Sequence, residues 1–351
     1  MREYAVSEMD DEFRKRLAIM KELLVDDARG RRGKRRILML VAALVLLPCL
    51  AVFARGGKEG ATAGKRFRIA VSLPPANSAW QAKLLDSVNG EAAKDTTNFD
   101  ITVKSAVDDA DQLNQMTTFK AGGYDMILCL PGNGSLMTPI CQHIYKSGTK
   151  LLIMDRPIEG DQYTAFDGGD NAQCGRNAAT YIGGRLEGKG QIAILRSYVG
   201  IPIDLQRYNG FMEVLKKDYP GITVLVEGDG ELNQQAGLKA MSNILPAYPH
   251  IDAVFSQDDE SAVGALTAIR NAKRMDIQFV TGMGGSNSAF KLMTEKNPLF
   301  RASMSYLPTM GGHALAMAKQ ILQGKTFPKN NIEPTVVVTQ DNVATYVNDG
   351  Y

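Results

Sequence analysis

The chain has 351 residues, of which 44% are hydrophobic and 22% are charged, and its formal net charge is +2. This composition is that of an ordinary globular protein with room for one large or two medium-sized domains. The near-neutral charge argues against a nucleic-acid-binding protein, because such proteins carry a marked excess of basic residues.

The start of the chain has the pattern of a targeting or anchoring segment. Residues 1–36 end in a cluster of arginine and lysine side chains, and residues 37–54 form an uncharged apolar run. The run is about as short as a membrane-spanning helix can be and longer than most signal-peptide cores. The basic cluster predicts that residues 1–36 are cytoplasmic or form a signal n-region, and that the chain after residue 54 lies outside the membrane. An uncleaved anchor, a lipoprotein modified at Cys49 and free secretion all fit this pattern. Residues 55–65 are expected to be a flexible glycine-rich linker.

Strand-like and helix-like segments alternate from residue 66 onward. The predicted strands cover residues 68–73, 100–106, 126–130, 151–155, 163–167, 191–195, 222–227, 253–256, 278–281, 301–305 and 335–339. The predicted helices cover residues 79–94, 110–121, 135–147, 171–187, 203–219, 232–248, 260–272, 287–296 and 309–322. This alternation predicts an α/β fold with parallel sheets covered by helices on both faces. So many strands exceed one typical sheet, and we expect two doubly wound lobes.

A charged pair directly follows the apolar strand that ends near residue 154. Asp155 and Arg156 stand at its carboxyl end, the edge at which open α/β sheets bind ligands. A carboxylate accepts hydrogen bonds from neighbouring hydroxyls, and a guanidinium donates from a planar fork. The pair therefore predicts a small polyhydroxylated ligand, although an ordinary surface ion pair would have the same sequence pattern.

Several further segments share a pattern with one known family. They are residues 69–73 (IAVSL), residues 77–80 (NSAW), the pair Asp155–Arg156, the pair Asp170–Asn171, residues 207–211 (RYNGF), residues 253–260 (AVFSQDDE) and the pair Leu307–Pro308. With these segments in this order, the chain from residue 66 onward resembles the type I periplasmic sugar-binding proteins of the ribose/galactose group, the extracytoplasmic receptors of ABC importers.

The resemblance implies a fold and a domain organisation. Two doubly wound lobes are expected to be joined by a hinge of three crossings near Asp170, Tyr306 and Phe327. Lobe 1 would comprise residues 66–168 and 307–327, and lobe 2 residues 169–306 and 328–351. The ligand would lie in the cleft between the lobes, and closure of the hinge would bury it.

The resemblance also implies which residues line the cleft. Asn77 and Trp80 correspond to the amide and the aromatic ring that the first lobe offers to a sugar. Asp155 and Arg156 correspond to the ligand-binding pair. Asp258 corresponds to a second-lobe position that hydrogen-bonds sugar hydroxyls.

Four positions depart from the family pattern and make ribose itself a doubtful ligand. An arginine, an aromatic residue, a carboxylate and a hinge amide are replaced by Leu205, Leu232, Gly284 and Tyr306, respectively. Each lost hydrogen bond that involves a charged group costs about 1.5 to 3 kcal/mol. Neighbouring polar residues offer substitutes, namely Asp204, Gln206, Asn233, Gln234 and Ser286. We include Tyr306, Asp204 and Asn233 in the predicted ligand-binding set.

Patterns of catalysis and metal binding are weak. Residues 183–189 match G-x-x-x-x-G-K, but Gly190 stands where a phosphate-binding loop needs serine or threonine, and the segment follows a helix rather than a strand. The histidines are far apart in the sequence, and the cysteines lack C-x-x-C spacing. We expect no catalytic residue, no metal and no cofactor.

These observations predict an extracytoplasmic substrate-binding protein. It would capture a monosaccharide or a derivative, act as a monomer without nucleic acid, and present the closed form to an ABC permease in the membrane. The alternative is an input protein that reports ligand occupancy to a membrane sensor kinase or chemoreceptor. A ligand-controlled repressor is disfavoured, because residues 10–28 offer one helix rather than a helix-turn-helix. The protein is expected in the periplasm or on the outer face of the cytoplasmic membrane, anchored by residues 37–54 or released after cleavage.

Overall fold

The computed structural model describes residues 66–351. The predicted cytoplasmic or signal region, the apolar segment at residues 37–54 and the predicted linker at residues 55–65 lie outside the described residues. Within residues 66–351, no helix combines the length and the apolar character that crossing a membrane requires. Every predicted strand and helix is present in this part of the chain, with boundaries that differ by a few residues.

The first lobe is built on a six-stranded parallel sheet in the order β11-β5-β4-β3-β1-β2. Its strands are β1 (Phe67–Leu73), β2 (Phe99–Ser105), β3 (Met126–Cys129), β4 (Lys150–Met154), β5 (Ala165–Gly169) and β11 (Asn330–Glu333). Its helices are α3 (Ala79–Ala92), α4 (Asp109–Ala121), α5 (Gly134–Lys146) and α11 (Met310–Leu322). Successive side chains of a strand face opposite sides, and the buried side chains separate accordingly. Ile127 and Ile153 pack with α4 and α5, whereas Leu128 and Met154 pack with α3 and α11.

The second lobe repeats this arrangement with one antiparallel edge strand. Its sheet has the order β12-β10-β9-β8-β6-β7, and only β12 runs against its neighbour. The strands are β6 (Lys189–Arg196), β7 (Gly221–Asp229), β8 (Ala253–Ser256), β9 (Phe279–Gly284), β10 (Phe300–Ser305) and β12 (Val337–Thr339). The helices are α6 (Asn171–Arg185), α7 (Pro202–Asp218), α8 (Gln234–Ala247), α9 (Asp259–Asn271), α10 (Asn287–Thr294) and α12 (Val343–Tyr346).

Most of these helices begin at a side chain that caps them. The caps are Ser78, Asp108, Asn133, Asp170, Asn233, Asp258 and Ser286, and each accepts a hydrogen bond from a backbone N–H of the first helical turn. Short polar residues are favoured at this position because they satisfy backbone donors that the helix leaves free. The caps therefore place polar side chains at the carboxyl edges of both sheets.

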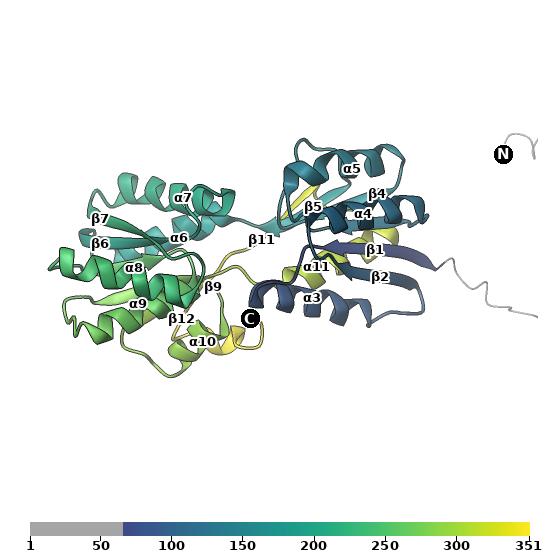
Figure 1. Cartoon of the computed structure of the whole chain (residues 1–351). Coiled ribbons are helices and arrows are strands. Elements are labelled where there is room, and N and C mark those ends of the chain that lie inside the picture. The colour runs from purple at the N-terminus through teal and green to yellow at the C-terminus, as the bar shows by residue number, and fades with distance from the viewer. Residues whose placement is uncertain (1–65) are drawn as a thin grey trace, which may run out of the picture. The chain divides into compact units, whose positions relative to one another are not determined.

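Three crossings connect the two lobes, which lie side by side in Figure 1. They run from β5 to α6 near Asp170, from β10 to α11 near Tyr306, and from β11 to β12 near Pro334. The predicted third crossing at Phe327 is wrong, because β11 pairs with β5 and returns residues 330–333 to the first lobe. Residues 330–333, which were predicted to belong to lobe 2, therefore belong to lobe 1. This strand was missed because Asn330–Glu333 is polar and partly exposed at a sheet edge.

Candidate functional site

The site begins at the carboxyl end of β4 with a residue in a rare backbone conformation. Asp155 has a φ of 58°, in the left-handed region that non-glycine residues seldom adopt. Its backbone N–H donates to the carbonyl oxygen of Asp167 on the neighbouring strand at 2.9 Å, which helps to hold this conformation. Conformations of this kind persist where surrounding contacts enforce them, and they are frequent at binding sites.

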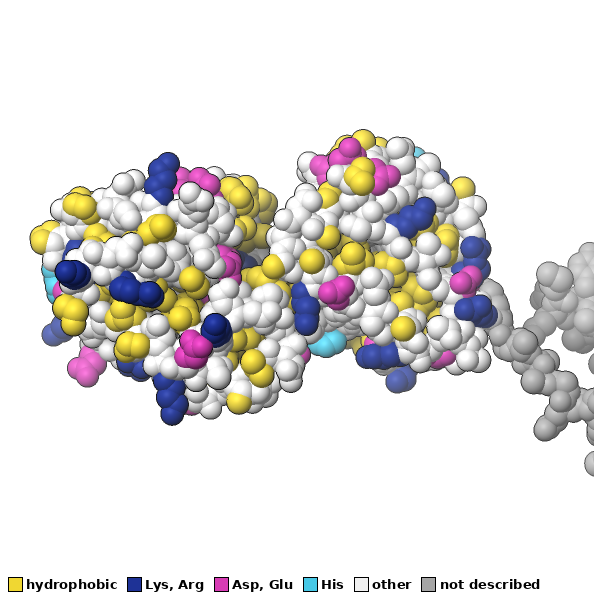
Figure 2. All heavy atoms as spheres, turned by 60° about the horizontal axis from the view of Figure 1, so that its bottom comes forward, with side chains coloured by type: hydrophobic (Ala, Val, Ile, Leu, Met, Phe, Trp, Pro, Cys, Tyr) yellow, Lys and Arg dark blue, Asp and Glu magenta, His cyan; other side chains and the backbone are white. Residues whose placement is uncertain are grey.

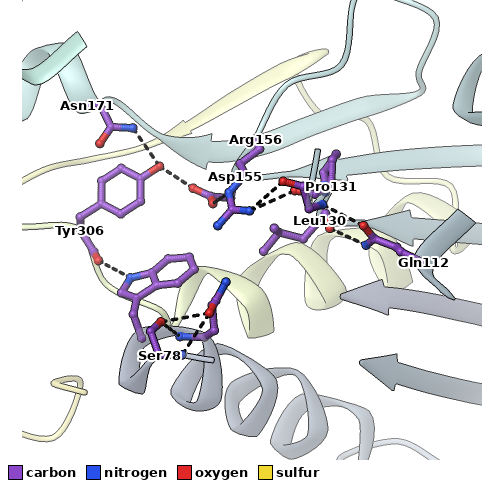
Figure 3. Close-up of polar contacts among 11 residues, drawn as sticks. Ser78, Gln112, Leu130, Pro131, Asp155, Arg156, Asn171 and Tyr306 are labelled. Carbon is purple, nitrogen blue, oxygen red and sulfur yellow. Dashed lines mark hydrogen bonds and ion pairs between the residues drawn. The ribbon is translucent and has the colours of Figure 1, made fainter. Parts of the chain in front are cut away.

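Arg156 is positioned by the loop that follows β3. Its guanidinium donates to the carbonyl oxygens of Pro131 and Gly132 at 3.3 and 3.2 Å, and its Nε lies 3.6 Å from the Asp155 carboxylate. Gln112 in turn holds this loop, because its amide donates to the Leu130 carbonyl and accepts from the Gly132 N–H, both at 2.8 Å (Figure 3). A buried glutamine on α4 thus fixes the acceptors that orient the arginine.

Tyr306 joins the first lobe to the second. Its hydroxyl donates to Asp155 Oδ1 at 2.6 Å and accepts from the Asn171 side chain at 3.4 Å (Figure 3). Burial, with the neighbouring Asp155 carboxylate, raises the pKa of the Tyr306 phenol well above its ordinary value. The phenol therefore stays protonated and keeps donating to Asp155 over the whole physiological pH range.

Trp80 lies beside Tyr306 in the first turn of α3. Its indole N–H donates to the Tyr306 carbonyl oxygen at 2.8 Å, and the two ring centroids are 6.1 Å apart. Trp80 is half-buried, so part of the residue remains accessible to solvent. Asn77, just before the helix, is exposed, and its backbone N–H donates to Gln81. The structure thus brings Trp80 next to the Asp155–Tyr306 pair and leaves the Asn77 side chain at the surface.

Arg207 continues the network into the second lobe. Its Nε donates to Asn171 Oδ1 at 2.9 Å, and its Nη1 donates to the backbone carbonyl of Gln257 at 2.6 Å. The guanidinium carbon lies 5.5 Å from the centre of the Tyr306 ring. Arg207 is only 6% exposed, which leaves this charge in a fixed orientation. An uninterrupted series of contacts therefore runs from Arg156 through Asp155, Tyr306 and Asn171 to Arg207.

Asp258 follows β8 and caps α9. Its Oδ1 accepts from the backbone N–H of Ser261 at 2.9 Å and from the Ser261 hydroxyl at 3.1 Å. Its second carboxylate oxygen makes no hydrogen bond within the part of the chain that the structure describes. Burial raises the pKa of Asp258 above its ordinary value, which indicates that its charged form lacks full solvation.

Besides Asn77, two further predicted residues stay outside this network. Asp204 is fully buried on α7, and its carboxylate accepts from Arg196 Nε at 2.6 Å and from the Gly200 N–H at 2.8 Å. Asn233 caps α8, and its side-chain amide donates to the Glu231 carbonyl at 3.0 Å. Both side chains are engaged in local structure.

The residues around position 205 form an apolar rim, whereas the family pattern has an arginine at this position. The exposed fractions of Tyr198, Val199, Ile201 and Leu205 lie between 36% and 59%. These residues occupy the connection from β6 to α7 and its first turn, at the carboxyl edge of the sheet. This edge therefore offers apolar surface to whatever enters between the lobes, and Figure 2 shows hydrophobic side chains gathered on the side of the second lobe toward the first.

Sequence reasoning missed three residues that the structure places in or behind the network: Gln112, Asn171 and Arg207. Asn171 and Arg207 stood in segments that carried the family resemblance, but the sequence assigned them no role. Gln112 gave no signal, because a helical glutamine has the pattern of a solvated side chain until its burial is known.

The site gathers groups that can hydrogen-bond a ligand and stack on it. It combines a carboxylate, two guanidinium groups, hydroxyl and amide groups, and an aromatic ring. Within residues 66–351, no cluster of histidine, cysteine and carboxylate side chains has the geometry of a metal site. Donors and acceptors held in this way match the hydroxyl groups of a small neutral polyol.

Two parallel-sheet lobes that share one polar network at their facing edges define a two-lobed ligand-binding protein. The periplasmic binding protein domain model matches residues 69–326, and the chain therefore belongs to that family. The similarity to type I periplasmic sugar-binding proteins inferred from the sequence is confirmed, and so is the fold of two α/β lobes.

Individual relatives agree with this assignment. The ribose import binding protein of Bacillus subtilis is 27% identical over 277 residues, which cover 79% of this chain and 88% of the relative. A solved fructose-binding periplasmic domain of a hybrid two-component system is 29% identical, with a TM-score of 0.68 and coverage of 80% and 93%. A solute-binding protein of a Bacillus halodurans ABC transporter, solved with myo-inositol, has a TM-score of 0.71 at 24% identity, with coverage of 81% and 98%. This last likeness concerns the fold.

Proposed function

We propose that this protein captures a monosaccharide or a closely related polyol between its lobes. The observation that carries the proposal is the network from Arg156 through Asp155 and Tyr306 to Arg207, which spans both lobes at the carboxyl edges of their sheets. A ligand that accepts from the arginines and donates to Asp155 and Asp258 would hold the two lobes together. Trp80 would cover an apolar face of the sugar ring.

The second lobe supports a ligand with fewer hydroxyls at one end. Leu205 is 43% exposed at the start of α7, where the family pattern has an arginine. A hydroxyl that met this apolar rim would lose its hydrogen bonds to water without replacement. A deoxy sugar, a pentose or a short polyol therefore suits the site better than a fully hydroxylated hexose.

In the first candidate role, the closed protein delivers its ligand to an ABC permease from outside the cytoplasmic membrane. The similarity to the ribose import binding protein supports this role. The second candidate role is sensing, in which occupancy is relayed to a membrane kinase. The 29% identity to a domain of a hybrid two-component system supports it.

A binding screen tests the proposal. The purified full-length protein is titrated with D-ribose, D-fructose, 2-deoxy-D-ribose, xylitol and myo-inositol while its melting temperature is recorded. A ligand present at 100 times its Kd stabilises the native state by about 2.7 kcal/mol, which is readily measured. No shift with any carbohydrate or polyol would refute sugar binding and leave the fold unaffected.

A second experiment separates transport from sensing. Mass spectrometry of the mature protein from its own cell envelope shows whether residues 1–54 are retained. Cross-linking to a permease in the presence of the ligand supports transport, whereas cross-linking to a histidine kinase supports sensing.

A further inference from the structure

The last residues of the chain return to the carboxyl edge of the second sheet. The Tyr351 carbonyl oxygen accepts from the backbone N–H of Asn287, the first residue of α10, at 2.7 Å. Gly350 is buried, and a β-carbon at this position would lie 2.6 Å from Asn287 Oδ1 and 2.9 Å from the Phe290 ring. These contacts hold the backbone of Tyr351 close against the start of α10.

The Tyr351 ring reaches the end of β9. A β-carbon on Gly284 would collide with the Tyr351 hydroxyl oxygen, so the phenol occupies the space that a side chain at position 284 would take. Gly284 also has a φ of 128°, a conformation that glycine alone adopts without strain. The glycine therefore creates the room into which the phenol extends.

The Tyr351 hydroxyl adjoins Gly284, and the next residue, Gly285, donates its backbone N–H to Asp259 Oδ2 at 2.7 Å. Burial, followed by the carboxylates of Asp258 and Asp259, raises the pKa of Tyr351 well above its ordinary value, and Arg207 acts in the opposite direction. Strands β8 and β9 are parallel neighbours, so the ends that carry Asp258 and Gly284 lie at one edge of the sheet. Tyr351 is therefore a protonated donor at the wall that holds Asp258 and Arg207.

This donor is unused. The hydroxyl of Tyr306 donates to Asp155 at 2.6 Å, and the hydroxyl of Tyr208 donates to Glu227, also at 2.6 Å. Among residues 66–351, the Tyr351 hydroxyl has no hydrogen-bond partner, although most of the residue is covered. The hydroxyl oxygen is not among the fully buried polar atoms without a partner, so it reaches solvent and is free to donate to a ligand or to water.

We propose that the Tyr351 hydroxyl hydrogen-bonds the ligand and is a specificity-determining residue of the second lobe, in the place that Gly284 leaves open. The inference rests on the proposed function, because it needs a hydroxylated ligand between the lobes. The proposal gives the second lobe a hydrogen-bond donor. Without it, Gly284 offers no side chain and Leu205 offers only apolar surface to the ligand.

The test compares single hydroxyl deletions in the full-length protein. Tyr351→Phe removes the donor and keeps the ring, whereas Tyr248→Phe makes the same change at the end of α8, beside the amino end of β8 and away from the site. The carbohydrate that most stabilises the wild type in the screen is titrated by calorimetry. We expect Tyr351→Phe to bind it about 3- to 10-fold more weakly and Tyr248→Phe to bind it like the wild type.

A set of monodeoxy analogues of the same carbohydrate identifies the contact. For one analogue, Tyr351→Phe and wild type should bind with equal affinity, because the hydroxyl that meets Tyr351 is already missing. Wild-type affinity in Tyr351→Phe for the parent sugar would refute the inference while sugar binding stands. Tighter binding by Tyr351→Phe or Tyr351→Ala would also refute it, since the phenol would then occupy the place of the ligand. A wild type that binds no carbohydrate would refute both the inference and the proposed function.

Discussion

Asp155 combines an uncommon backbone conformation with a central place in the polar network. Its φ of 58° directs the chain away from β4, and its carboxylate accepts from Tyr306 while lying beside Arg156. The side chain is only 7% exposed, so its remaining acceptor capacity is directed at a small number of possible partners. A residue of this kind is expected to affect ligand binding more than stability.

Asp155→Asn should weaken ligand binding by about 10- to 100-fold, because hydrogen bonds to a charged group contribute about 1.5 to 3 kcal/mol. Asparagine tolerates the left-handed conformation, so the fold should be kept. Calorimetric titration measures the affinity. The control is Asp161→Asn, a carboxylate of the same lobe that is 83% exposed and pairs with Lys329. Equal affinities in both variants and the wild type would remove Asp155 from the site.

Asp204 was a predicted ligand residue, and its surroundings give it another role. Its pairing with Arg196 is buried, and the Asp204 carboxylate raises the pKa of that arginine. Asp204→Asn should lower the free energy of unfolding by about 3 kcal/mol, because it removes the fully buried carboxylate of the Arg196 ion pair and leaves only the partly exposed Glu227 beside the guanidinium. Urea unfolding measures this loss, and the folded variant should bind the ligand within about 2-fold of wild type. If Asp204→Asn instead lost much of its ligand affinity and kept its stability, Asp204 would be a ligand-binding residue.

At the scale of an element, the start of α9 holds two carboxylates with different tasks. Asp258 caps the helix, whereas Asp259 ties the helix to the connection between β9 and α10. Asp259 Oδ2 accepts from the N–H groups of Gly285 and Ser286 at 2.7 and 2.8 Å and from the Ser303 hydroxyl at 2.9 Å. Its Oδ1 is buried without a partner. Burial therefore raises the pKa of Asp259 from 3.8 to about 7.

The pH dependence of stability follows from this shift. Between pH 3.8 and about 7, the folded protein binds the Asp259 proton more tightly than the unfolded chain does. The contribution of Asp259 to stability is therefore present at low pH and is lost as the pH rises through this interval. Asp259→Asn keeps an acceptor for the three donors and cannot ionise. The free-energy difference between pH 4 and pH 8 should shrink by on the order of 2 to 4 kcal/mol in this variant.

The measurement is urea unfolding at several pH values. Asp276→Asn is the control, because the Arg274 guanidinium holds the pKa of Asp276 well below its ordinary range. That variant should lose stability by a similar amount at every pH from about 5 to 8. If Asp259→Asn has the same pH profile as wild type, the carboxyl of Asp259 is ionised throughout and the argument fails.

At the scale of the whole molecule, the middle crossing carries both mechanical and chemical links. Tyr306 lies in this crossing, contacts Trp80 and Asp155 of the first lobe, and belongs to a buried apolar cluster with residues of both lobes. A cavity of about 250 Å³ adjoins the crossings and is lined by residues of all three, among them Asp170, Leu307 and Thr335. We propose that the crossings move into this space when the hinge closes.

Ligand binding should therefore make the molecule more compact. We expect the radius of gyration from small-angle X-ray scattering to decrease when the carbohydrate found in the screen is added to wild type. Asp155→Asn should keep the larger radius at the same ligand concentration. An unchanged radius for fully occupied wild type would show that binding takes place without closure.

Much of the architecture could be predicted because local patterns and layer packing agree. The apolar runs of β3 and β4, the capping residues and the regular alternation of elements each depend on neighbours in sequence. The polar strand β11 could not be found in this way, because its only strand signal is pairing with β5. The pair Asp155 and Arg156 was visible for the same local reason, since polar residues directly after a buried strand stand at the binding edge.

The sequence by itself determined the α/β class, the two lobes and one wall of the candidate site, because hydrophobic periodicity and strand-end chemistry are properties of contiguous residues. Only the tertiary structure decided what lies opposite that wall. It joined Asn171, Arg207 and Tyr306 to Asp155, buried Asp204 against Arg196, and brought Tyr351 to Gly284 from the far end of the chain. Each of these contacts depends on which strands become neighbours in the folded sheet. The separation of two residues along the sequence does not show whether they lie close together in the fold.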